Sequence, residues 1–160
     1  MALLRLSALA CALAACGQAG AAPGVASGIA PPVGWTSLPE IATAVGAAAR
    51  AEGVTVDGAE AWGEPAMGCY AAWVGLHGEG ATSQQVMQGL EAAKLTLTDV
   101  VKPELGDDGL ITLAFERAPY RGHLRVRVAA PALTMLACFA NDREPAACEL
   151  ACTPLLGALK

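Results

Sequence analysis

The chain has 160 residues, with 10 basic and 15 acidic side chains and a formal net charge of −5. This length predicts one globular domain, and the acidic balance argues against nucleic acid as a partner. Hydrophobic residues make up 54% of the chain, but much of this share is Ala, and the clearest apolar run lies at the N-terminus.

The N-terminal segment has the pattern of an export signal. Arg5 precedes an apolar run over residues 6–15 that only Ser7 interrupts. This run spans about ten residues, whereas a helix that crosses a bilayer needs roughly twenty. Residues 1–15 are therefore expected to be a removable signal peptide. Its removal takes away Arg5 and leaves nine basic against fifteen acidic residues, a formal charge of −6.

The end of this signal, Leu13-Ala14-Ala15-Cys16-Gly17, resembles the lipobox of bacterial lipoproteins. The resemblance covers these residues alone and implies cleavage before Cys16 and attachment of diacylglycerol to its thiol. Two or three acyl chains, at about 0.8 kcal/mol per buried methylene group, hold a protein durably at a membrane. Gly17 is not the Asp that retains many such lipoproteins at the inner membrane, so the outer membrane is favoured, facing the periplasm or the cell surface.

Ordinary cleavage at Ala19-Gly20-Ala21 is the alternative, and it would release a soluble periplasmic protein. Under either reading, the segment after the signal consists mainly of Gly, Ala and Pro, without charge or periodicity. Residues 16–34 are therefore expected to be a flexible tether, and residues 35–160 a single domain.

The first half of this domain predicts a helix, a hairpin and a second helix. Ser37 and Glu40 have capping-box spacing, which favours a helix over 38–52. Strands over 54–62 and 67–74 follow, joined at a Gly-Pro-containing turn. Thr82 and Gln85 repeat the capping box and favour a helix that runs to about residue 93.

The second half predicts a three-stranded meander and a last helix. A short strand is expected over 96–101, followed by a loop over 103–109. Stronger strands are expected over 110–116, 123–129 and 133–140. Pro145 begins a helix that should end at Pro154.

The order α-ββ-α-βββ-α lacks regular strand-helix-strand alternation. It predicts an α+β fold of two layers, with three helices packed on a mostly antiparallel sheet of about four to six strands. In the middle strand of the meander, Leu124, Val126 and Val128 should face inward, and the residues between them outward.

Four cysteines remain once Cys11 is lost with the signal and Cys16 is lipidated. In an exported chain, Cys69, Cys138, Cys148 and Cys152 predict two disulfides. Cys148 and Cys152 lie four residues apart on one helix face, so each should bond to a strand. The preferred pairing is Cys138–Cys148 with Cys69–Cys152, and the swapped pairing is its rival. A four-thiolate zinc site and a Cys69 nucleophile with His77 or His123 as base are further alternatives.

A cluster of basic side chains stands out in this acidic chain. Its members are Arg117, Arg121, His123, Arg125 and Arg127, with Tyr120 expected as an exposed aromatic at the hairpin tip. Guanidinium groups on one strand face predict a surface for an acidic partner, a lipid phosphate or cell-wall carboxylates. An ordinary solvated face is the alternative interpretation.

No catalytic motif or cofactor-binding motif is found, so no cofactor and no enzymatic activity are expected. The loop over 75–80 lacks the pattern of a phosphate-binding loop, and His77 within it is expected at the surface. The sequence predicts an envelope lipoprotein with a non-catalytic binding or assembly role, whose partners are the membrane and an envelope protein or surface component. A small-ligand or metal-binding lipoprotein is the alternative, and an enzyme of unknown class is the third hypothesis.

Overall fold

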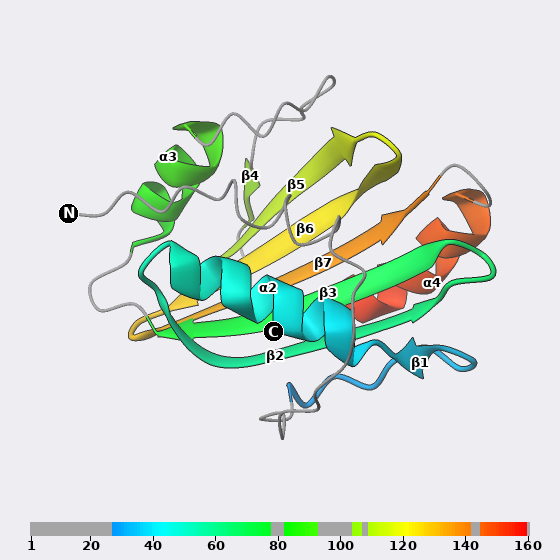
Figure 1. Cartoon of the computed structure of the whole chain (residues 1–160). Coiled ribbons are helices and arrows are strands. Elements are labelled where there is room, and N and C mark those ends of the chain that lie inside the picture. Colours follow the sequence, from blue (N-terminus) through cyan, green and yellow to red (C-terminus); the bar gives the residue numbers. More distant parts are fainter. Residues whose placement is uncertain (1–26, 78–81, 93–103, 107–108, 142–144, 160) are drawn as a thin grey trace.

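Figure 1 shows the computed structural model of the chain, which describes residues 27–77, 82–92, 104–106, 109–141 and 145–159. Within these residues the strands form one antiparallel sheet of seven strands. The elements in chain order are β1 (Thr36–Ser37), α2 (Pro39–Ala51), β2 (Thr55–Glu64), β3 (Cys69–His77), α3 (Ser83–Ala92), β4 (Glu104–Leu105), β5 (Leu110–Arg117), β6 (Tyr120–Ala129), β7 (Ala132–Ala140) and α4 (Pro145–Gly157).

The predicted α+β class is confirmed, and the element order matches the prediction except for the two-residue strands β1 and β4, which bring the sheet to seven strands where about four to six were expected. The sheet order is β1-β2-β3-β7-β6-β5-β4, with the two-residue strands β1 and β4 as its outermost members. Asp57-Gly58, which interrupts the expected first strand, becomes a register shift between Val56 and Gly58 and does not end β2. β4 lies within the expected loop over 103–109, and the strand expected over 96–101 lies outside the described residues.

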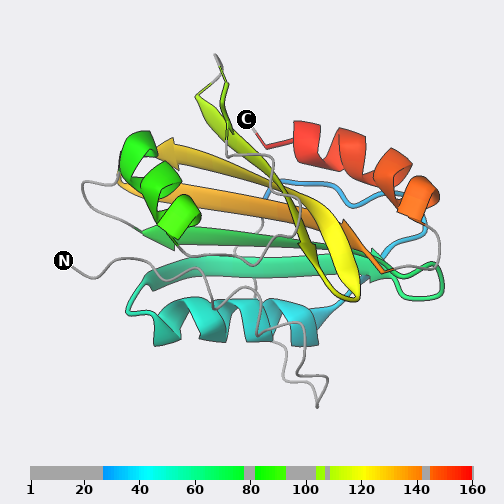
Figure 2. The same ribbon diagram turned by 90° about the horizontal axis from the view of Figure 1, so that it is seen from above.

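The helices cover both faces of the sheet, where the sequence predicted two layers. Val45 of α2 and part of α3 pack on one face, and α4 lies on the other, as the view in Figure 2 shows. The reason is visible in β3 and β7, whose central residues are buried on both sides of the strand. Strands in the middle of a sheet that is covered twice read as continuous apolar runs.

Two helix ends differ from their sequence predictions. Ser37 does not cap α2, because it pairs with Trp62 in β1 while the Leu38 N–H donates to the Ala61 carbonyl at 2.8 Å. Pro154 lies inside α4 and does not end it. The helix continues because Leu155 beyond the proline is buried against the sheet.

The packed part of the chain begins before residue 35, so the tether does not extend to residue 34 as expected. The Ser27 hydroxyl and backbone N–H donate to the Glu60 carboxylate at 2.6 and 3.0 Å. Ile29 and Trp35 pack against the same apolar cluster as Trp62, on the α4 side of the sheet. In the described part of the chain, no helix combines the length and the apolar character that a bilayer span requires.

Gly122 tests the close contact between β6 and β7. It lies opposite Phe139, and a Cβ added to it would overlap the Cys138 carbonyl oxygen and lie 2.6 Å from the Phe139 Cα. Only backbone movement relieves this overlap, so Gly122→Ala should lower the free energy of unfolding by about 1–3 kcal/mol. Denaturant unfolding measures the loss.

Gly157→Ala is the matched control. A Cβ at Gly157, the last residue of α4, has nothing within 4 Å. This substitution should leave the stability unchanged or raise it slightly. Equal destabilisation by both substitutions would contradict the close β6–β7 contact.

Candidate functional site

The four domain cysteines gather between α4 and the sheet. Cys69 lies at the start of β3 and Cys138 near the end of β7, and both helix cysteines face these strands as predicted. The exposed fractions of Cys69, Cys138, Cys148 and Cys152 are 0%, 1%, 1% and 4%. This sulfur cluster is therefore closed to solvent.

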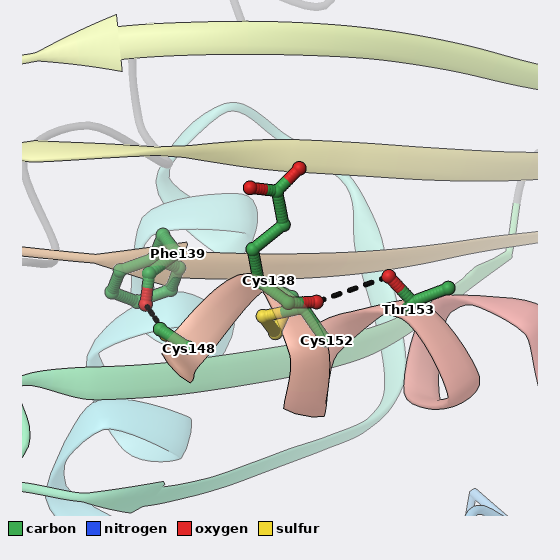
Figure 3. The surroundings of a disulfide bond; sticks show 6 residues. Cys138, Phe139, Cys148, Cys152 and Thr153 are labelled. Carbon is green, nitrogen blue, oxygen red and sulfur yellow. Dashed lines mark hydrogen bonds between the residues drawn. A yellow bond between two sulfur atoms is a disulfide. The ribbon is translucent and has the colours of Figure 1, made fainter. Parts of the chain in front are cut away.

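Cys138 and Cys152 form a disulfide, with 5.7 Å between their Cα atoms (Figure 3). The preferred prediction of Cys138–Cys148 is therefore wrong, and the observed bond belongs to the rival pairing. The reason is the direction of α4, which runs back along β7 (Figures 1 and 2). Four helical residues advance about 6 Å, close to the spacing of two strand residues. Cys152 thus reaches the level of Cys138, and Cys148 stays near the end of the strand.

Cys148 lies at the level of Cys69, and the two thiols contact each other. The Cys148 Sγ donates to the Phe139 carbonyl oxygen at 3.5 Å. Burial, together with the hydrogen bond and charge of Cys69, raises the pKa of Cys148 to about 12, although a hydrogen bond from the Tyr70 backbone acts in the opposite direction. A thiol with this pKa stays protonated near neutral pH and is a weak nucleophile.

The two histidines considered as bases for a catalytic Cys69 do not lie next to it. His77 ends the same strand, eight residues and about 26 Å from Cys69. Its Nδ1 instead lies 4.0 Å from the Asp57 carboxylate, with both side chains about half exposed. His123 lies on β6, two strands away from β3, so the strand spacing alone separates its backbone from that of Cys69 by about 10 Å. The geometry therefore argues against a nucleophilic cysteine.

The basic face of β6 is defined by Arg121, His123, Arg125 and Arg127, which lie on the α4 side of the sheet. Strand alternation is as predicted, because Leu124 and Val126 are buried on the opposite side. Arg125 is half buried, and its Nη1 donates to the Leu156 carbonyl at 3.1 Å, near the C-terminal end of α4. The other three members of this face are exposed.

Tyr120 is not part of this face, so its predicted role as an exposed aromatic is wrong. Its half-buried ring packs on the other side of the sheet, with its centroid 5.7 Å from that of Phe139 and 5.9 Å from that of Tyr70. Gly122 has no side chain beside these rings and leaves them room. Arg117 pairs with Tyr120 through the backbone ladder, and its side chain lies outside the described part.

A pocket of about 220 Å³ lies next to the disulfide. Its polar side chains are Glu116, Arg121, His123 and Glu149, and Cys138, Cys148 and Cys152 are also in its wall. Glu116 is a neighbour of the basic side chains in the sequence, whereas Glu149 comes from α4 and reaches the basic face only through the fold. Within the described residues no group of three or more His, Cys, Asp or Glu is placed to hold a metal ion.

A second pocket, of about 490 Å³, lies at the β2 edge of the sheet, next to α2. It contains Arg50, Asp57 and Glu60, and the Glu60 carboxylate is already bonded to Ser27. No pattern in the sequence indicated this site, because its residues come from segments that the fold alone brings together.

No protein-family model matches the chain, and no curated protein or solved structure is significantly similar to it.

Replacing both cysteines of the disulfide tests its contribution to stability. The bond closes a loop with a sequence separation of 14 residues, for which the loop-entropy model gives about 3 kcal/mol. Cys138→Ala/Cys152→Ala should lower the free energy of unfolding by about that amount, and the double change leaves neither sulfur free to form a new bond. Thr153→Ala, which removes a methyl group and an exposed hydroxyl that donates to the Glu149 carbonyl, is the control and should cost less than about 1 kcal/mol.

Proposed function

We propose that this chain is an exported lipoprotein of the cell envelope with a non-catalytic binding or assembly role, and that the basic face of β6 binds an anionic partner there. The observation that carries the proposal is the alignment of three arginines and a histidine on one strand face of an acidic protein. Guanidinium groups in this arrangement favour carboxylate and phosphate groups.

The sheet presents this face rigidly. β6 lies between β5 and β7 and is paired with both over most of its length. Arg125 joins the strand to the end of α4, where a positive charge interacts favourably with the helix dipole. His123 and Arg127 flank Arg125 and are exposed. Side chains on a fixed backbone lose less conformational entropy on binding than those on a loop.

Anchoring through Cys16 would keep this face near a membrane. Ten residues separate Cys16 from Ser27, where contact with the domain is already established. A fully extended chain of that length reaches about 35–40 Å. A partner of the basic face would therefore be a component that lies at or close to the bilayer.

A small anion in the pocket next to the disulfide is the alternative occupant, since Arg121 and His123 are in its wall. Its volume of about 220 Å³ is below the roughly 300–1,000 Å³ of most ligand pockets. Glu116 and Glu149 would also repel an anion there. Contact with a larger partner over the exposed face is therefore favoured.

Cys16→Ser tests the lipid anchor. Without a thiol to acylate, the full chain should move almost completely from the membrane fraction to the soluble fraction and lose incorporation of a labelled fatty acid. Cys11→Ser, within the signal, is the control and should change neither readout. If the unaltered chain does not incorporate the labelled fatty acid, that result would contradict the lipid anchor.

Arg127→Glu tests the binding face. The full chain is crosslinked in cells and recovered from the envelope, and the amount of captured partner is measured. Charge reversal should reduce the capture about tenfold, which corresponds to about 1.4 kcal/mol, and added salt should weaken it in the unaltered chain.

Arg50→Glu is the matched control for this experiment, because it makes the same charge change on α2, which packs on the other face of the sheet. It should leave the capture unchanged. Equal losses from both variants, or no loss from either, would argue against the basic face as the binding surface.

A further inference from the structure

The two sulfurs that are outside the observed disulfide are already brought together by the fold. Cys69 pairs in register with Ala140, two residues beyond Cys138 on β7. Cys148 lies one helical turn before Cys152 on α4. The sulfur pairs Cys69 with Cys148 and Cys138 with Cys152 thus repeat the same helix-to-strand geometry on two neighbouring strands.

We propose that Cys69 and Cys148 form a second disulfide, so that α4 is bonded to both β3 and β7. The two thiols hydrogen-bond to each other, and both are buried in the same apolar cluster as the first bond. In the reaction, two S–H bonds break and one S–S bond forms. The two electrons and two protons pass to the disulfide of another protein in the compartment to which the chain is exported, and that disulfide becomes a dithiol.

Because the folded protein buries both thiols, this second disulfide has to form before folding is complete. In the folded dithiol, Cys148 is 1% exposed and its raised pKa keeps it protonated, so it reacts slowly with any oxidant. While α4 is still undocked, both thiols are accessible. The proposal depends on the proposed function for one element only, which is that export supplies the oxidant.

Peptide mapping of the full chain, purified from the envelope fraction, tests the pairing. The chain is unfolded in alkylating reagent without reductant, because a buried reduced pair would otherwise escape alkylation. Trypsin and a glutamyl endopeptidase then separate the four sulfurs, since Glu149 lies between Cys148 and Cys152. The relevant peptides are 61–79, 128–143, 144–149 and 150–160.

The expected result is that peptide 61–79 is linked to 144–149, and 128–143 to 150–160. Peptides 61–79 and 144–149 recovered alkylated and unlinked would overturn the proposal. A bond from 61–79 to 150–160 would overturn it as well. So would four alkylated cysteines with a bound metal ion, because that result means a thiolate site.

A chain recovered with residues 1–15 still attached would contradict the export proposal but not the pairing. In that case the purified chain is reduced and unfolded, then refolded in a mixture of reduced and oxidised glutathione so that both thiols are accessible, and the same map is made. The 61–79 to 144–149 link should then appear, and its absence would overturn the pairing independently of export.

Unfolding between pH 8 and 11 gives a second readout, with Cys69→Ala as the comparison. In this variant the Cys148 thiol is retained, and burial, the largest cause of its raised pKa, still holds that pKa above the ordinary value of 9.0. The unfolded state then loses its proton first, so stability should fall as the pH rises above about 9. A disulfide does not titrate, so the gap in stability between the unaltered chain and the variant should widen with pH. A constant gap would contradict the second bond.

Discussion

The attachment of α4 to the sheet is the constraint on which the rest of the structure on that side of the sheet depends. α4 packs over β7 and β3, and the Cys138–Cys152 bond holds it there. Without α4, the apolar side chains on this side of the two central strands would face water. The exposed end of the helix also positions Arg125, since its guanidinium binds the Leu156 carbonyl. Helix docking therefore determines both the burial of the core and the shape of the basic face.

A covalent bond suits this core because many of its residues are small. Ala61, Ala71, Ala72, Ala137 and Ala140 are all buried in the sheet. Burial of Ala removes little apolar area from water, and the stabilisation scales with that area. A bond that restricts the unfolded chain adds about 3 kcal/mol, which is large beside a typical total of about 5–15 kcal/mol.

Local patterns predicted most of the elements, and long-range packing accounts for the differences. The Thr82–Gln85 box is formed as expected, with the Gln85 N–H donating to the Thr82 hydroxyl at 3.2 Å. The same pattern at Ser37 does not form a capping box, because the Ser37 backbone pairs with Trp62 in the sheet. The spacing of Cys148 and Cys152 showed that both face the sheet. The choice between them for Cys138 depends on the direction in which α4 crosses β7, and no local pattern carries that information.

The basic face of β6 and the sulfur cluster are neighbours on the same side of the sheet. His123 pairs in register with Cys138, so the disulfide lies directly beside the exposed strand face. Arg125 connects the same strand to the far end of the helix that this bond anchors. Reduction of the sulfurs would loosen α4 and with it the spacing of the charged groups, because the helix end is one of their supports. Under the proposed export, oxidative folding would thus complete the proposed binding surface in the same compartment as the proposed partner.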